Sequence, residues 1–175
     1  MKATGIVRRI DDLGRVVIPK EIRRTMRIRE GDPLEIFTGA NGEVIFKKYS
    51  PVGELGEVAA IYAESLSVGT RFPVIICDRD HCIAASGISK KEVVERRVTP
   101  FLENVMECRK TASNVPDFAL EGVEIATAVA APVLCAGDIC GAVVLLAVDE
   151  GVVAGESDLN LARVAAAFLG KQLED

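Results

Sequence analysis

The residues best suited to chemistry near the start of this sequence are arginines. Residues 1–29 hold nine Lys or Arg against three Asp or Glu, a local charge of +6, although the whole chain of 175 residues carries −5. A guanidinium group is planar and always charged, so it clamps a phosphate or pairs with two acceptors of guanine. No aromatic residue precedes Phe37, which disfavours stacking on single-stranded bases. Basic groups on a small domain are often only solvated, but this density favours a surface for duplex DNA built from Lys2, Arg8, Arg9, Arg15, Lys20, Arg23, Arg24 and Arg27.

Four of the five cysteines form two pairs with equal spacing, Cys77 with Cys82 and Cys135 with Cys140. Each pair brackets a predicted turn, and we expect Cys135 and Cys140 to oppose each other directly about Gly137-Asp138. Three roles are open to these thiols: small buried apolar residues, a redox pair, or metal ligands. An odd number of cysteines, all within residues 51–175, favours reduced thiols over a disulfide framework.

Little else in the sequence suggests catalysis. A single histidine, no glycine-rich phosphate loop and no run of metal ligands argue against an enzyme, a resident cofactor or a metal site. The longest uncharged runs cover 13 and 10 residues, short of the roughly 18 that would suggest a membrane span. With no apolar leader at the start, the sequence predicts a cytoplasmic protein without a membrane partner.

Short predicted elements must position the basic residues. Residues 6–10 and 15–18 are predicted strands around a tight turn, and Pro19 begins a short helix. A hairpin over residues 34–49 follows. About 50 residues of such elements bury too little surface to fold alone. Since no Cys or His precedes Cys77, dimerisation is the remaining means of stabilising them.

The second half predicts an antiparallel sheet with flanking helices. Residues 124–134 and 139–148 are almost wholly apolar, which is typical of a central hairpin covered on both faces. Further strands are expected over 72–77 and 82–85, and helices over 54–67, 89–97, 100–110 and 156–173. The apolar faces of the first and last helices exceed what one sheet can cover, so we expect them to join subunits through Leu55, Val58, Tyr62, Leu159 and Phe168.

Charge divides the chain at the same place as these patterns. Residues 1–50 carry +4 and residues 51–175 carry −9. The sequence therefore predicts a DNA-binding domain over 1–50, a linker with the start of a helix over 51–55, and a regulatory or oligomerisation domain over 56–175.

The first 50 residues resemble the AbrB family of swapped-hairpin DNA-binding regulators. The resemblance is carried by Lys2-x-Thr4-Gly5-Ile6-Val7-Arg8-x-Ile10-Asp11-x-Leu13-Gly14-Arg15-Val16-Val17-Ile18-Pro19 and Glu21-x-Arg23-Arg24. It implies a dimer in which two chains interleave their hairpins into one β-barrel. It also implies a DNA-facing surface formed by Arg8, Arg15, Arg23 and Arg24.

The second half resembles a GAF domain, through Ala131-Pro132-Val133-Leu134-Cys135-Ala136-Gly137-Asp138-Ile139-Cys140-Gly141-Ala142-Val143. Many GAF domains bind a small effector between the sheet and the middle helices, while others only oligomerise. No Asn-Lys pair occurs, so the cyclic-nucleotide form of the fold is disfavoured.

Together these patterns predict an α+β protein: an AbrB-type swapped-hairpin dimeric β-barrel followed by a GAF-like antiparallel sheet with flanking helices. This order of domains resembles a family of forespore transcription regulators. The expected partners are double-stranded DNA, a second chain through the N-terminal domain, a homotetramer through the C-terminal helices, and an effector of unknown identity. Two rivals remain: a GAF-type thiol oxidoreductase or redox sensor with an accessory DNA-binding head, and an antitoxin-like protein binder.

Overall fold

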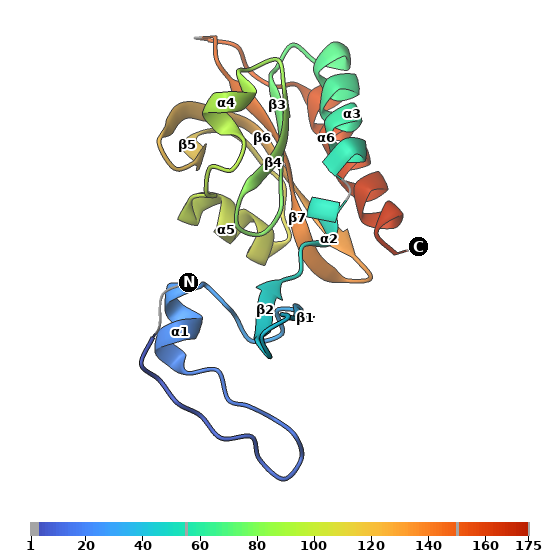
Figure 1. Cartoon of the computed structure of the whole chain (residues 1–175). Helices are drawn as coiled ribbons and strands as arrows, with labels where there is room; N and C mark the ends of the chain where they lie inside the picture. The colour runs from blue at the N-terminus through green and yellow to red at the C-terminus, as the bar shows by residue number, and fades with distance from the viewer. Residues whose placement is uncertain (1–3, 55, 150, 175) are drawn as a thin grey trace. The chain divides into compact units, whose positions relative to one another are not determined.

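The chain divides into two units, Met1–Tyr49 and Ser50–Asp175, in the computed structural model (Figure 1). The structure describes residues 4–54, 56–149 and 151–174. Lys2 and Leu55, both expected in functional surfaces, lie outside these residues. Each unit is considered by itself below.

The first unit contains one short helix and one hairpin. Helix α1 (Lys20–Thr25) starts directly after Pro19, whose φ of −58° suits helix entry. Strands β1 (Leu34–Thr38) and β2 (Val44–Lys48) pair antiparallel, with Leu34 opposite Lys48. The hairpin prediction is thus confirmed.

The two strands predicted within residues 6–18 are wrong for the single chain. These residues form an extended loop closed by a turn, in which the amide of Asp11 donates to the carbonyl of Arg15 at 3.0 Å. Their apolar side chains are exposed, Val7 by 89%, except for the half-buried Ile18. β-Branched residues favour a strand, but a strand forms only where another backbone completes its hydrogen bonds.

The second unit is built on a sheet with strand order β4-β3-β7-β6-β5. All neighbouring strands are antiparallel. The strands span Val74–Cys77 (β3), Cys82–Ser86 (β4), Ala112–Leu120 (β5), Val123–Cys135 (β6) and Asp138–Ala147 (β7). β7 is buried along almost its whole length because helices cover both faces of the sheet, as its apolar run predicted.

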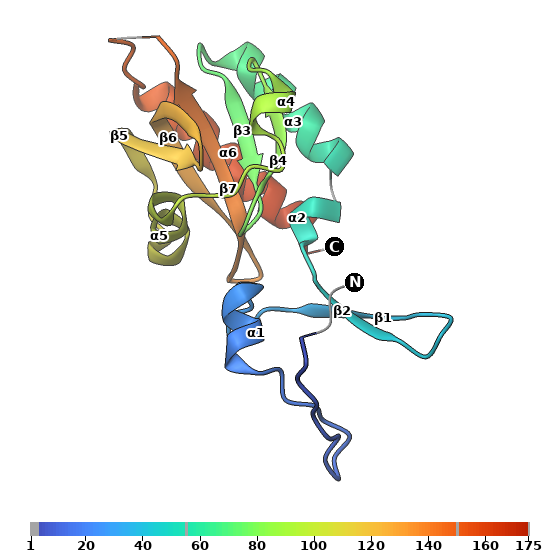
Figure 2. The same cartoon turned by 60° about the vertical axis from the view of Figure 1, so that its left-hand side comes forward.

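One face of this sheet is covered by α3 (Gly56–Gly69) and α6 (Glu156–Gln172), and the other by α4 (Lys90–Val93) and α5 (Pro100–Cys108) (Figures 1 and 2). A one-turn helix α2 (Pro51–Glu54) precedes α3. Ser50 caps α2, since its Oγ accepts from the amide of Gly53 at 3.1 Å and donates to Asp78 at 2.8 Å.

Two glycines lie so close to neighbouring backbone that no side chain would fit at their positions. A β-carbon at Gly141 in β7 would collide with the carbonyl oxygen of Cys77, and one at Gly170 in α6 would collide with that of Leu134. α6 can therefore lie directly on the backbone of β6 only because residue 170 has no side chain.

Candidate nucleic-acid interface

Seven of the eight basic residues expected to bind DNA lie in the described part of the chain, and all seven belong to the first unit. α1 carries Lys20, Arg23 and Arg24 in exposed positions, and Arg27 follows the helix half-buried. Three more are exposed on the extended loop: Arg8, Arg9 and Arg15. The sequence thus identified side chains that solvent, and hence a polyanion, can reach.

Arg15 is oriented by the turn in which it lies. Its backbone amide donates to Asp11 Oδ1 and its Nε donates to Asp11 Oδ2, both at 2.8 Å. The amide of Leu13 donates to the same carboxylate at 3.0 Å. The hydrogen bonds from Arg15 and Leu13 lower the pKa of Asp11. The ion pair engages Nε, and a guanidinium carries further donors on its two Nη atoms for a phosphate.

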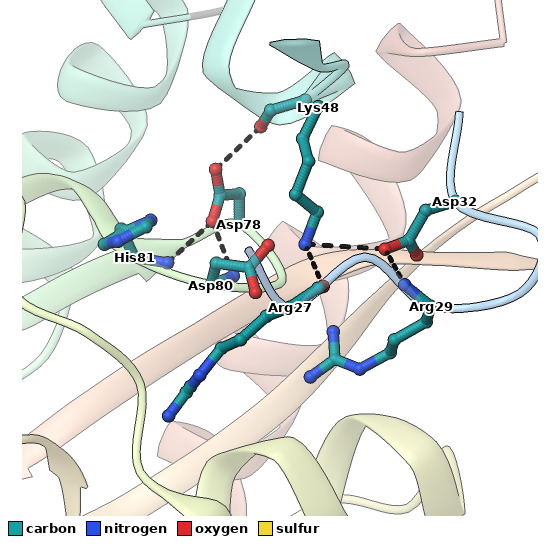
Figure 3. Close-up of polar contacts among 8 residues, drawn as sticks. Arg27, Arg29, Asp32, Lys48, Asp78, Asp80 and His81 are labelled. Carbon is teal, nitrogen blue, oxygen red and sulfur yellow. Dashed lines mark hydrogen bonds and ion pairs between the residues drawn. The ribbon is translucent and has the colours of Figure 1, made fainter. Parts of the chain in front are cut away.

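The end of α1 is held by contacts that sequence reasoning missed (Figure 3). Lys48 of β2 donates from Nζ to the carbonyl oxygen of Arg27 at 2.9 Å and lies 3.4 Å from Asp32 Oδ2. Asp32 Oδ2 also accepts from the amide of Arg29 at 2.8 Å. Lys48 is 16 positions from Asp32 and 21 from Arg27 in the sequence, so no local spacing pattern predicts its contacts with them.

The cysteines behave differently in their two pairs. Cys135 and Cys140 form a disulfide with their Cα atoms 6.1 Å apart, a span that a disulfide accommodates. The expectation of reduced thiols is therefore wrong for this pair. The predicted register is also wrong, because the strands turn at Ala136-Gly137 and Cys135 lies opposite Asp138. An irregularity between Val133 and Leu134 then brings the two cysteines together.

Cys77 and Cys82 lie opposite each other across the β3–β4 turn, as predicted, and are buried thiols. The contact with the Cys82 thiol and complete burial raise the pKa of Cys77 well above its ordinary value. A protonated, buried thiol is a poor nucleophile. The turn itself is organised by Asp78, whose Oδ1 accepts from the amides of Asp80 and His81 at 2.7 Å (Figure 3).

The outer surfaces of α3 and α6 combine packed and exposed apolar residues. Tyr62 stacks on Phe168 with ring centroids 4.7 Å apart. Tyr62 and Leu159 pack against the core and Val58 is half-buried, whereas Phe168 is 41% exposed. The most exposed apolar residues of these helices were not among those predicted: Ile61, Val68 and Val164.

Two hollows lie at the margins of the second unit. One of about 460 Å³ lies beside β4, lined in part by Ala60, Ile83 and Lys91. The other, of about 730 Å³, lies between β5, β6 and residues 147–149 and 151–153. In the described residues no cluster of three or more His, Cys, Asp or Glu side chains could hold a metal ion.

Within the described part of the chain no helix combines the length and apolar character needed to cross a bilayer.

Comparison with known proteins shows the family to which the chain belongs. Residues 54–174 match the family described as stage V sporulation protein T C-terminal, transcription factor. Stage V sporulation protein T of Bacillus subtilis (strain 168) is 48% identical over 182 aligned residues, 99% of each chain. The chain belongs to the stage V sporulation protein T family.

Each unit by itself also resembles proteins outside this family. Transition state regulatory protein AbrB of the same organism is 59% identical over 51 residues, which are 29% of this chain and 52% of that protein. Residues 7–53 also match the MazE antitoxin family, described as antidote-toxin recognition. The GAF domain of an Acinetobacter phosphoenolpyruvate-protein phosphotransferase superposes with a TM-score of 0.57 at 15% identity, covering 73% of this chain and 84% of that one.

These matches confirm the predicted α+β fold, an AbrB-like N-terminal domain followed by a GAF-like antiparallel sheet with helices. The protein is a transcriptional regulator with an AbrB-type DNA-binding domain and a GAF-like C-terminal domain.

Proposed function

We propose that this chain regulates sporulation genes by binding duplex DNA through its basic residues. The observation that carries the proposal is the exposure of four guanidinium groups on a unit that is 59% identical to AbrB: those of Arg8, Arg15, Arg23 and Arg24. Lys2, Arg9, Lys20 and Arg27 add charge to this surface. Residues 1–50 form the DNA-binding domain, 51–55 the linker and helix start, and 56–175 the regulatory domain.

The DNA-binding unit acts as a dimer in this proposal. The loop of residues 4–18 exposes Val7, Ile10, Leu13 and Val17, each by 70% or more. Such a run of apolar surface on a small unit favours burial against another chain. Interleaving the loops of two chains supplies the strand partners that residues 6–10 and 15–18 lack within the described single chain.

The GAF-like unit joins two such dimers into a tetramer. Its α3 and α6 expose Ile61, Val164 and Phe168, and Phe168 stacks on Tyr62. Exposed apolar surface that exceeds scattered single residues marks protein interfaces. Two linked DNA-binding heads gain affinity through effective concentration when both engage one duplex. The same unit is the place for an effector, and the hollow between β5, β6 and residues 147–149 and 151–153 offers it room.

The function is tested by footprinting the full-length protein on duplex DNA from a set of promoters active during spore formation. We expect protection of defined segments at concentrations that leave a random duplex of equal length unprotected. Equal binding to every duplex would contradict a sequence-reading regulator. An excess of specific over random binding of roughly 10³-fold or more is ordinary for such proteins.

A second candidate function, redox sensing, is favoured by the disulfide between Cys135 and Cys140. With a peroxide as oxidant, one thiol becomes a sulfenic acid and releases water; the second thiol then attacks that sulfur, forming the S–S bond and a second water. Two thiols are thereby oxidised while the peroxide is reduced. Thiol titration of the reduced protein should fall from five to three after peroxide and recover with dithiothreitol. A titre that stays at five would exclude this role.

A further inference from the structure

Helix α1 ends in a backbone conformation that requires support. Arg27 has a φ of 50°, the left-handed region that glycine enters freely and other residues enter at a cost. The amide of Ile28 donates to the carbonyl of Arg23 at 2.7 Å, and that of Arg27 to the carbonyl of Arg24 at 3.3 Å. This pair of bonds is the Schellman arrangement, in which residue 27 occupies the position usually taken by glycine.

The ammonium of Lys48 meets this strained residue directly. It donates to the carbonyl oxygen of Arg27, which it reaches from β2 (Figure 3). The Asp32 side chain is only 2% exposed and that of Lys48 is 26% exposed, so the ion pair is shielded from water. Asp32 in turn accepts from the amide of Arg29. One carboxylate and one ammonium therefore connect the segment after α1 to the hairpin.

Burial contributes little to holding α1 within one chain, because each of its six residues is at least partly exposed. A conformation of this kind persists only where surrounding contacts enforce it. We propose that Lys48 is a positioning residue for DNA binding: with Asp32 it fixes the end of α1, and thereby the directions of Arg23, Arg24 and Arg27. The inference rests on the proposed arginine surface.

The positioning role and simple electrostatics predict opposite changes in DNA affinity when Asp32 is replaced, so the two can be told apart. Replacing Asp32 with Asn removes a negative charge from the DNA-binding unit, so simple electrostatics predicts tighter binding to a polyanion. If Asp32 orients Lys48, the same substitution loosens the end of α1 and weakens binding. Glu30→Gln is the matched control, since Glu30 is an exposed acid in the same loop and the charge change is identical.

The experiment measures binding of the full-length protein to duplex DNA by fluorescence anisotropy over a range of salt concentrations. We expect Asp32→Asn and Lys48→Met each to weaken binding roughly tenfold, the order expected for losing a charge-assisted hydrogen bond. The double variant is expected to bind no more than about twofold more weakly than Lys48→Met, because coupled residues give non-additive effects. Lys48→Arg, which still presents donors, should recover most of the affinity. Glu30→Gln should bind as tightly as wild type or more tightly.

Binding by Asp32→Asn as tight as that by Glu30→Gln would overturn the positioning role, as would fully additive effects of the two substitutions. If Lys48→Met does not fold by far-ultraviolet circular dichroism, the comparison of Asp32→Asn with Glu30→Gln decides the question. Arg24→Ala serves in the same assay to separate the two proposals. Loss of binding in Arg24→Ala but not in Asp32→Asn overturns only the positioning role, whereas unchanged binding in Arg24→Ala overturns the arginine surface and this inference with it.

Discussion

The backbone amide of Ala136 donates a 2.8 Å hydrogen bond to the carboxylate of Glu174. Ala136 lies in the β6–β7 turn and Glu174 follows α6, so the contact joins the last helix to the hairpin that carries Cys135 and Cys140. Lys171 Nζ donates to the other carboxylate oxygen at 2.6 Å. The turn, the disulfide and the end of α6 therefore form one connected region of the GAF-like unit.

The contacts of Glu174 predict a pH dependence. The hydrogen bonds from Lys171 and Ala136 lower the pKa of Glu174 below its ordinary value of 4.5. A carboxyl group whose pKa is lower in the folded state stabilises the fold above its unfolded pKa, and this contribution disappears as pH falls through the lowered value. The melting temperature of Glu174→Gln should lie below that of wild type at pH 7, and the two should converge toward pH 3. A gap that stays constant over this range would contradict the role assigned to Glu174.

Gly170 predicts a reversal of the usual effect of alanine in a helix. Alanine ordinarily stabilises a helix relative to glycine by about 1 kcal/mol. At position 170, however, a β-carbon collides with the Leu134 carbonyl oxygen, and forcing extra atoms into a packed core costs about 1–3 kcal/mol or more. Gly170→Ala should therefore lower the free energy of unfolding, measured by urea denaturation.

Gly69→Ala is the matched control, because Gly69 ends α3 and a β-carbon there meets no atom within 4 Å. It should be neutral or stabilising by up to about 1 kcal/mol. Equal stability of the two variants would show that α6 does not lie on β6 as closely as described.

Much of the fold could be predicted from the sequence because buried faces of helices and strands carry apolar residues at regular spacing. The apolar runs of β6 and β7 and the helical spacing of α6 each reflect a face covered by protein. β5 was missed because Pro116 and Asp117 interrupt its pattern, and Asn114 takes a φ of 51°. For residues 6–18 the opposite error occurred: strands were predicted from their β-branched residues, but no strand pairs with them within the described chain.

Cysteine accessibility predicts a clear order of reaction. Cys108 is an exposed thiol, whereas Cys77 and Cys82 are buried and the pKa of Cys77 is raised. In the native oxidised protein, iodoacetamide should modify Cys108 quickly and leave Cys77 and Cys82 unmodified until the protein unfolds. Peptide mass spectrometry resolves the sites. Early modification of Cys77 would contradict its placement in the core.

The helix surface of the GAF-like unit predicts the effect of a single charge on assembly. Val164 is 66% exposed on α6, so Val164→Glu should leave the fold intact while placing a charge in the proposed interface. Sedimentation should show a dimer in place of a tetramer. Val153→Glu provides the control, because Val153 is similarly exposed but lies in a loop before α6. A tetramer that survives Val164→Glu would place the interface elsewhere.

The candidate DNA surface was only partly predictable. The local excess of positive charge predicted a basic surface. The resemblance to the AbrB family then predicted that four of its arginines face DNA. The contacts of Lys48 with Arg27 and Asp32 could not be predicted from the sequence, because they depend on how the hairpin folds back beside the end of α1. The turn before Arg15 was predicted, but the hydrogen bonds by which Asp11 orients Arg15 were not.

The most direct test of the DNA-binding surface is the salt dependence of binding by the full-length protein and its arginine variants. Each phosphate contact contributes a slope of about −0.9 to the logarithm of affinity against the logarithm of salt concentration. Replacing Arg8, Arg15, Arg23 or Arg24 with Ala removes two such groups from a dimer, so a phosphate-contacting arginine should flatten the slope by roughly 2 while lowering affinity. Unchanged affinity and unchanged slope in all four variants would contradict DNA binding through this surface.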